Sequence, residues 1–415
     1  MKSKKIIIRR DIVWSISPLF YFSKVSGLAP FNCSTGKSSI WDMLYSLILT
    51  SFVLCSFLYT ITMKINYQYP QSSYTVMIPD IFKTFVSYPS LLITLVLFST
   101  WHRRKFQAFF RKISFVDKVL LQPDHFNNTV QRKTKIIISS QLSVVVITIL
   151  ILFWYDYFVW SDDHNACEYF QAIPLHMMGA SIFLQFVNLI ILLRHRYAFL
   201  NKKLENYFEK QVFSPSSNSH NSFQISRSAV RDNLRIAELQ ALHISLHEAA
   251  HIVSSCYGIT LLLELAYLFV KLIQDMYCTL VTAFNMDYVE TRAGVGETVG
   301  ILLCWVLVSL FKMVFIAISC QMTSNEANHT RALVHKLMAK GVSATSLRRF
   351  SHQLLHYELH FTTCGIVVLN STMLHSLAGA VTTYLIILLQ FQFVVSSSSS
   401  SNTSLSPFFN ESVKT

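Results

Sequence analysis

The chain has 415 residues, of which 52% are hydrophobic and 14% are charged. A soluble domain of ordinary composition carries roughly a quarter charged residues, so these values favour a membrane protein over a series of soluble domains. The formal net charge is +13. The basic residues alternate with apolar blocks instead of lining one solvated face, which argues against a nucleic-acid-binding protein.

The first 39 residues are basic and are expected to form a cytoplasmic N-terminus. The stretch 11–31 does not read as a cleavable signal peptide, because Pro18, Lys24 and Pro30 interrupt its apolar residues. Insertion would therefore depend on the first transmembrane helix.

Seven later blocks are long enough to cross a bilayer, which needs about 20 mostly apolar residues per helix. The predicted spans are Ile40–Met63, Val76–Thr100, Lys135–Trp160, Phe170–Leu193, Tyr257–Phe284, Thr298–Cys320 and Gly365–Val394. The second is the weakest, because it contains two prolines and two charged residues: Pro79, Asp80, Lys83 and Pro89. The sequence predicts an all-α membrane protein with seven transmembrane helices, or six if the second block fails to insert.

The distribution of Lys and Arg sets the orientation of these helices. The N-terminal segment and alternate loops hold 29 of them, in residues 1–39, 101–135, 194–256 and 321–360. The opposite set holds 3, in residues 64–75, 161–169, 285–297 and 395–415. Because basic residues accumulate in cytoplasmic loops, the N-terminus is predicted inside and the C-terminus outside. This excludes a G-protein-coupled receptor, whose N-terminus lies outside.

A long amphipathic cytoplasmic helix is predicted over residues 225–255, leading into the fifth span. It contains His247-Glu248-Ala249-Ala250-His251, which fits the His-Glu-x-x-His motif of zinc proteases. No third ligand stands at a recognised spacing, and His243 lies on the same face. We therefore interpret this face as a structural or subunit-contact surface and expect no metal, no other cofactor and no enzymatic activity.

Aromatic and polar residues gather at the predicted outer ends of the spans, where they could form a chamber for a small organic ligand. The candidates are Trp305, Tyr155, Tyr157, His176, Asp275 and Tyr277. The alternative is the aromatic belt found at membrane interfaces. Trp305 lies deepest in its span and is the strongest candidate. Three charged residues inside spans, Glu264, Lys271 and Lys312, are expected to pair with one another or to face a water-filled cavity.

Residues 395–415 form a Ser-rich extracellular tail, which we expect to be disordered. The tail carries two candidate glycosylation sites, Asn402 and Asn410. Two cysteines are predicted near the outside, Cys167 and Cys278, so a disulfide between them is considered.

The seventh span ends Thr383-Tyr384-Leu385-Ile386-Ile387-Leu388-Leu389-Gln390-Phe391. This resembles the signature of insect gustatory receptors, which is Thr-Tyr, five hydrophobic residues and Gln-Phe at the end of the last helix. Residues 27–31, Gly-Leu-Ala-Pro-Phe, are also similar to the N-terminus of that family. The seven spans and the cytoplasmic N-terminus agree with this resemblance.

The resemblance implies a ligand-gated cation channel of four subunits, as a homotetramer or a heterotetramer with related receptors. It divides the chain into a six-helix bundle with the ligand pocket (40–320), a cytoplasmic anchor (321–364) and a pore-lining helix (365–394). Gln390 and Phe391 would form the gate, since a ring of Phe can close a pore by dewetting and a Gln ring can contact hydrated cations. The alternative is that Gln390 bonds a neighbouring helix.

The implied function is that of a gustatory receptor in the plasma membrane of chemosensory neurons, with lipid and permeating cations as its other partners. Members for common sugars carry Glu after the Tyr of the signature, whereas Leu385 follows here. A bitter compound or another cue is therefore favoured as tastant, and a fructose-type receptor is the alternative. An unrelated multi-pass transporter is a second alternative, although the internal repeats typical of transporters are not evident.

Overall fold

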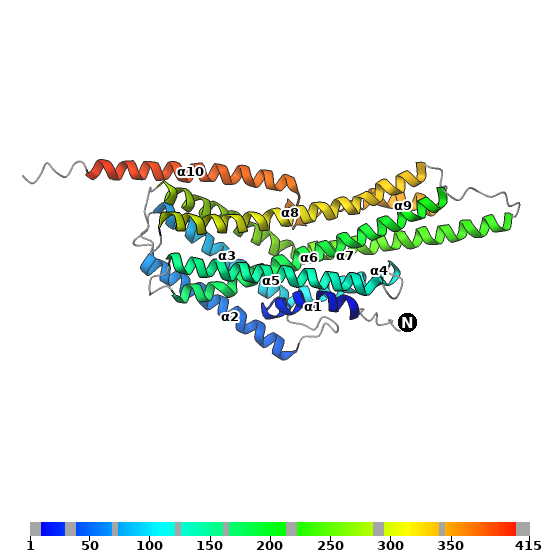
Figure 1. Ribbon diagram of the computed structural model, residues 1–415, viewed down its shortest axis with the longest axis horizontal. Helices are drawn as coiled ribbons and strands as arrows, with labels where there is room; N and C mark the ends of the chain where they lie inside the picture. The colour runs from blue at the N-terminus through cyan, green and yellow to red at the C-terminus, as the bar shows by residue number, and fades with distance from the viewer. Residues whose placement is uncertain are drawn as a thin grey trace, which may run out of the picture.

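The structure is a computed structural model that describes residues 10–29, 39–68, 74–120, 126–160, 166–212, 222–284, 294–339 and 345–403. The described residues are almost entirely helical (Figure 1). The elements are α1 (Arg10–Val25), α2 (Ile40–Met63), η1 (Lys64–Gln68), α3 (Tyr74–Thr100), α4 (His102–Leu120), α5 (Phe126–Trp160), α6 (Ala166–Val212), α7 (Ser222–Ala283), α8 (Val295–Ala339), α9 (Thr345–His356), β1 (Thr362–Thr363), β2 (Val367–Val368) and α10 (Ser371–Thr403).

Seven of the described helices are long and apolar enough to cross a membrane: α2, α3, α5, α6, α7, α8 and α10. The prediction of an all-α protein with seven transmembrane helices is therefore confirmed. α2 has the predicted limits, and α3 is one helix despite Pro79 and Pro89. An odd number of spans places the two ends of the chain on opposite sides of the membrane.

Three helices extend well beyond the predicted spans. α6, α7 and α8 have 47, 62 and 45 residues, and at 1.5 Å per residue α7 alone is about 90 Å long. The hydrocarbon core of a bilayer is only about 30 Å thick, so these helices must project from it. The projecting ends of α7 and α8 lie with α9 at one end of the molecule (Figure 1), which is the cytoplasmic end by the distribution of basic residues.

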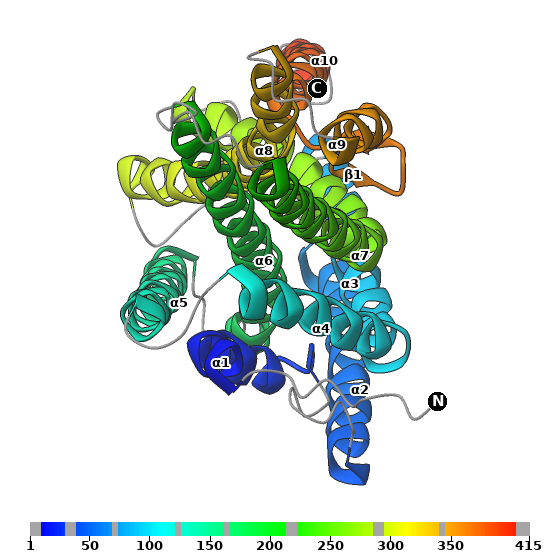
Figure 2. The ribbon, with the colours of Figure 1, turned by 90° about the vertical axis from the view of Figure 1, so that its right-hand side faces the viewer.

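Two shorter amphipathic helices pack against this end of the bundle. α4 buries Phe109, Ile113 and Val116, whereas α9 buries Leu347, Phe350 and Leu354. Figure 2, seen from the cytoplasmic end, shows α4 on the α6 and α7 side of the bundle and α9 beside α7 and α8. The periodic apolar residues of each helix form the face that packs, so two of the segments predicted to be cytoplasmic contain helices that pack on the bundle.

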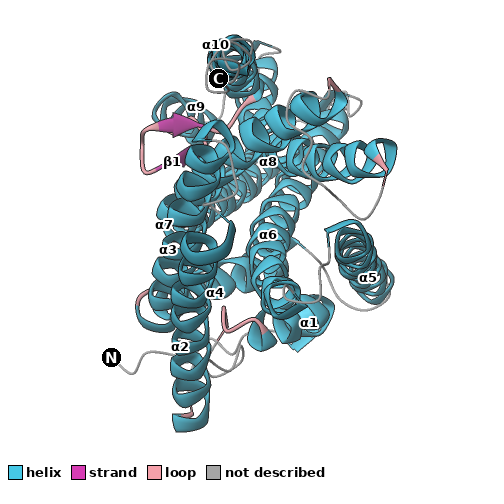
Figure 3. Cartoon of the chain, turned by 90° about the vertical axis from the view of Figure 1, so that its left-hand side faces the viewer, coloured by secondary structure: helices cyan, strands magenta, loops and turns pink. Residues whose placement is uncertain are grey.

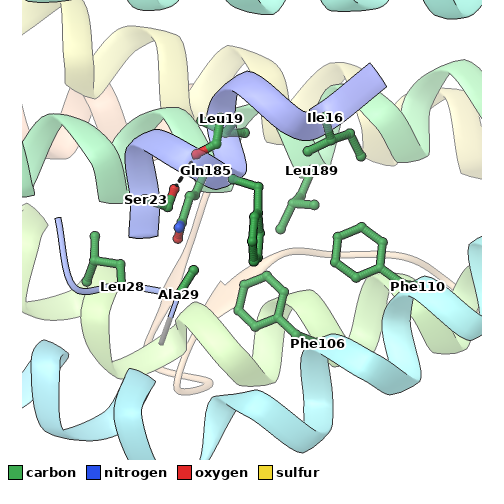
Figure 4. Close-up of a pocket in the computed structure, with 10 residues that line it drawn as sticks. Ile16, Leu19, Ser23, Leu28, Ala29, Phe106, Phe110, Gln185 and Leu189 are labelled. Carbon is green, nitrogen blue, oxygen red and sulfur yellow. Dashed lines mark hydrogen bonds between the residues drawn. The ribbon is translucent and has the colours of Figure 1, made fainter. Parts of the chain in front are cut away.

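The N-terminal segment contains a helix, α1, that the sequence analysis did not predict. α1 packs on α5 and α6, and the Lys135 ammonium lies 4.1 Å from the ring centre of Trp14. Lys24 forms an ion pair with Asp42 at 3.0 Å. A cavity of about 30 Å³ separates α1 from Phe106, Phe110 and other residues of α4 and α6 (Figure 4). It has room for about one water molecule, so α1 is closely packed and leaves no ligand-sized space there.

A short antiparallel hairpin connects α9 to α10 (Figure 3). The seventh span was predicted to begin at Gly365, but this residue lies in the turn of the hairpin and α10 begins at Ser371. Cys364 and Gly365 have φ angles of 55° and 75°. This left-handed conformation is incompatible with a right-handed helix, so α10 cannot begin at Gly365. The Asn370 side chain then accepts a hydrogen bond from the backbone N–H of Met373 at 3.0 Å, which caps the new helix.

The last described helix extends beyond the predicted end of the seventh span at Val394. α10 continues through the Ser run to Thr403, because residues 396–403 contain neither Gly nor Pro and adding residues to an existing helix costs little. Asn402 therefore lies in the last turn of α10. Asn410 lies outside the described residues.

The hairpin is held against α7 at Gly258. A Cβ atom at this position would lie 3.2 Å from the backbone N and 3.3 Å from the Sγ of Cys364, which is closer than ordinary van der Waals contact. One turn earlier, the Ser254 hydroxyl donates a hydrogen bond to the Thr362 carbonyl at 3.1 Å. The lack of a side chain at Gly258 thus lets the segment before α10 contact α7 directly.

We expect Gly258→Val to destabilise the protein by about 1–3 kcal/mol, the usual cost of overpacking a close contact. Thermal unfolding of the purified chain in detergent measures the effect. Gly379→Val is the matched control, because no atom lies within 4 Å of a Cβ built there. Equal stability of the two variants would contradict the close contact.

Candidate functional site

A charged cluster is buried in the outer half of the bundle, between η1, α3 and α7. Asp80, which is 8% exposed, accepts hydrogen bonds from Lys64 Nζ at 2.5 Å and Gln274 Nε2 at 3.0 Å. Lys83 Nζ lies 3.0 Å from the same carboxylate. An unpaired charge inside a membrane protein is costly, so each of these side chains depends on the others. Asp80 therefore ties three elements together.

A second group of charges connects α7 with α8. Lys271 pairs with Asp275 one turn along α7 at 2.8 Å, and its ammonium lies 4.6 Å from the ring centre of Trp305 on α8. Glu264 lies 3.9 Å from Lys312. The expectation that the charged residues in the spans pair is met for Glu264 and Lys312, whereas Lys271 pairs with Asp275. Lys271 also makes a cation–π contact, which is strengthened where water is excluded.

Trp305 is the centre of an aromatic cluster formed by α5, α6 and α8. The ring centres of Phe153, His176 and Trp305 are 5.0–5.5 Å apart, and Trp305 is only 7% exposed. Through Lys271, this cluster adjoins Asp275. Three of the predicted ligand-binding candidates, Trp305, His176 and Asp275, are thus brought together in the interior of the outer half.

The other three candidates lie elsewhere. The Tyr155 hydroxyl donates to the Glu297 carbonyl at 3.3 Å, near the outer start of α8. Tyr157 is 41% exposed, as expected for a residue of the interfacial aromatic belt. Tyr277 is fully buried and donates a hydrogen bond to the Gln392 side chain of α10 at 3.0 Å. Tyr277 therefore connects α7 to the last helix.

The signature residues on α10 are exposed, whereas the residue that follows them is buried. Thr383, Tyr384, Gln390 and Phe391 are exposed, and Phe391 is exposed by 60%. Gln392 is buried against α7. The Tyr384 ring lies 6.1 Å from Phe269 of α7. The end of α10 thus turns Gln390 and Phe391 away from its own bundle.

A large groove lies between α3, α7 and α10, apart from the aromatic cluster. Its volume is about 800 Å³. The residues that line it are apolar except for the hydroxyl of Tyr384: Ile78, Pro79, Ile81, Phe82, Phe85, Val86, Ala266, Phe269, Val270, Ile273, Tyr384, Ile387 and Leu388. This surface offers almost no hydrogen bonds, in contrast to the cluster around Trp305.

The His-Glu-x-x-His sequence does not assemble a zinc site. The His247 ring packs on Tyr357 at 4.9 Å, and His243 lies between Tyr197 and Phe350. The Glu248 carboxylate forms an ion pair with Lys112. No group of three or more His, Cys, Asp or Glu among the described residues could hold a metal ion. These contacts fit the interpretation of a structural helix face.

The disulfide considered between Cys167 and Cys278 is not formed. Cys278 is a free thiol on α7. The side chain of Cys167 lies outside the described part of the chain. Both cysteines are predicted near the outer side of the membrane. A shared side of the membrane does not by itself bring two cysteines within the distance that a disulfide requires.

The Asp80 cluster was not among the sites predicted from the sequence. In the sequence alone, Asp80 and Lys83 weaken the second predicted span, and Lys64 lies in a predicted outer loop. The signal was present, because ionisable residues inside a transmembrane segment are usually paired and functional. A charged pair three residues apart in an apolar helix could have indicated this site.

We expect Asp80→Asn to destabilise the chain strongly, by about 3–5 kcal/mol, because Lys64 and Lys83 would lose the carboxylate that neutralises them. Thermal unfolding in detergent and the amount of protein at the cell surface measure this. Glu358→Gln is the matched control, since this carboxylate is 53% exposed and its ion pairs contribute only about 0–1 kcal/mol. Similar unfolding temperatures for both variants would contradict the role of Asp80.

Comparison with known proteins identifies the family. Residues 16–394 match the family model described as "7tm Chemosensory receptor". Among curated proteins of Drosophila melanogaster, gustatory receptor 28b is 30% identical over 159 residues, which are 38% of this chain and 34% of that protein. The gustatory receptor for sugar taste 43a is 27% identical over 167 residues, which are 40% and 38% of the two chains. The alignments thus span little more than a third of these relatives.

The fold is similar to that of the insect olfactory receptor OR5 from Machilis hrabei, with a TM-score of 0.62. The superposition covers 91% of this chain and 97% of that one, at 13% sequence identity. The structure of the same receptor in complex with eugenol gives a TM-score of 0.59. The family match and the seven apolar helices indicate a multi-pass plasma membrane protein, and the curated relatives are receptors and not enzymes. The chain belongs to the 7tm chemosensory receptor family, and its curated relatives are insect gustatory receptors.

Proposed function

We propose that this chain is a subunit of a tastant-gated, weakly selective cation channel in the plasma membrane of chemosensory neurons. The observation that carries the proposal is the contact between Tyr277 and Gln392. This contact connects α7 with α10. α7 contributes Lys271 and Asp275 to the cluster around Trp305, and α10 carries Gln390 and Phe391.

The exposure of Gln390 supports a pore-lining role for the end of α10. Gln390 lies inside a predicted span, yet its side chain is turned away from the bundle. A polar side chain at the surface of a transmembrane helix is more stable when it faces water or another subunit than when it faces lipid. Several copies of this helix around an axis would provide both. A tetramer, of identical chains or with related receptors, is the assembly that we propose.

Phe391 follows Gln390 and is also exposed, which suits a hydrophobic gate. A ring of apolar side chains can block ions by excluding water from a narrow pore. Opening then requires that α10 shift or rotate. The next residue, Gln392, accepts a hydrogen bond from Tyr277 of α7. A displacement of α7 would therefore be transmitted to the turn of α10 that carries Phe391.

The tastant would bind at the cluster around Trp305. The aromatic faces of Trp305 and Phe153 suit a ring or another apolar group, and Lys271 with Asp275 offers charged hydrogen-bond partners. The side chains of Phe153, Trp305 and Asp275 are buried, so a ligand must displace some of these contacts. That displacement is the event that we propose moves α7.

A bitter compound or another small organic cue is the favoured tastant, and a fructose-type sugar is the alternative. Leu385 argues against the main sugar branch. The similarity to a relative described as a gustatory receptor for sugar taste supports a sugar as the alternative tastant. The OR5 structure with eugenol supports the general idea that a fold of this kind accepts a small aromatic molecule.

We expect Phe391→Ala to raise the current that flows without ligand, because a smaller side chain would let water and ions enter the proposed gate. Whole-cell recording at matched surface expression measures it. Phe393→Ala is the control, since Phe393 is similarly exposed but lies about 200° further around the helix. Unchanged basal and evoked currents in Phe391→Ala, or equal effects of both substitutions, would contradict the gate.

A further inference from the structure

Two histidines on the cytoplasmic helix α9 stand one turn apart. His352 and His356 are both exposed, and residues four apart on a helix share one face. The centres of their imidazole rings are 5.3 Å apart. The side chains therefore project together from the surface and face one another.

This distance suits two imidazoles that share one metal ion. With metal–nitrogen bonds of about 2.0–2.1 Å and a near-tetrahedral angle, the centres of two such rings lie about 5 Å apart. Neutral imidazole is a good ligand for Zn²⁺, Cu²⁺ and Ni²⁺. The two rings thus need little rearrangement to bind such an ion.

The backbone that carries the pair is held in place by the opposite face of α9. Phe350 is 1% exposed and Leu354 2% exposed, so the helix is anchored to α7 and α8. The Arg331 guanidinium also donates a hydrogen bond to the Leu354 carbonyl at 3.1 Å. Since the helix is already formed, binding a metal costs mainly the rotamer freedom of two side chains.

The chain contains a second pair with the same spacing that lacks this geometry. His247 and His251 on α7 are also four residues apart, but the His247 ring packs on Tyr357 at 4.9 Å. His247 is half-buried, whereas His251 is exposed. The same spacing, with one ring packed on Tyr357, makes this pair a matched control.

We propose that His352 and His356 form a binding site for a divalent late transition metal, with Zn²⁺ as the representative ion. The two imidazoles supply two ligands, and water completes the coordination, since the described residues contain no group of three or more donors. His356 is the last residue of α9, so the ion would bridge two side chains of the final turn of this helix. The segment that leads to the hairpin and α10 follows directly.

The test is a titration of the full-length chain, purified in detergent without a polyhistidine tag, with Zn²⁺ and Ni²⁺. Competition with a chromophoric chelator gives the affinity. We expect His352→Gln with His356→Gln to weaken the tightest site by about tenfold or more, because both imidazole ligands are removed. His247→Gln with His251→Gln should retain the wild-type affinity.

Two further readouts show whether the pair itself holds the ion. Zn²⁺ should raise the unfolding temperature of the wild type and of the control variant, but not that of the His352/His356 variant. Electron paramagnetic resonance of bound Cu²⁺ should show two imidazole nitrogens, and one after His352→Gln. Wild-type affinity in the His352/His356 variant, or equal losses in both variants, would overturn the proposal. Neither measurement depends on channel activity.

Discussion

The buried carboxylate of Asp80 is the interaction on which the outer half of the structure depends. It neutralises Lys64 and Lys83 and accepts a hydrogen bond from Gln274, so η1, α3 and α7 meet at one point. In a low-dielectric interior these groups are stable only as a set. This constraint explains how a second span with two prolines and two charges is held in the bundle. It also fixes the part of α7 that carries Lys271, Asp275 and Tyr277.

α7 connects the remaining functional elements. Its outer half contacts Trp305 through Lys271 and α10 through Tyr277. Its middle contacts the hairpin at Gly258, and its cytoplasmic half packs on α4 and α9. A single helix of 62 residues therefore touches the proposed ligand site, the proposed gate and the cytoplasmic helices. Rigid helices transmit displacements over such distances when they can adopt two packed arrangements.

Hydrophobic length and the placement of Lys and Arg predicted the seven spans, because the bilayer imposes both patterns directly on the sequence. The same criteria missed α1 and the hairpin before α10, which depend on tertiary packing and on the backbone conformation at Cys364 and Gly365. Three of the predicted ligand-binding candidates, Trp305, His176 and Asp275, lie together, and their role in binding stays a prediction. The partners of Asp80 and the contact from Tyr277 to Gln392 were not foreseen, because they join residues far apart in the chain whose distance no local pattern specifies.

The central proposal is that this chain lines a cation-conducting pathway that opens in direct response to a small molecule. The most direct test is cation flux in liposomes that contain only the purified chain, measured with a panel of bitter compounds and sugars. We expect a ligand-evoked flux of Na⁺ and K⁺ with little preference between them, and a constitutive flux when Phe391 is replaced by Ala. An assembled, correctly oriented protein that conducts neither with ligand nor with this substitution would contradict it.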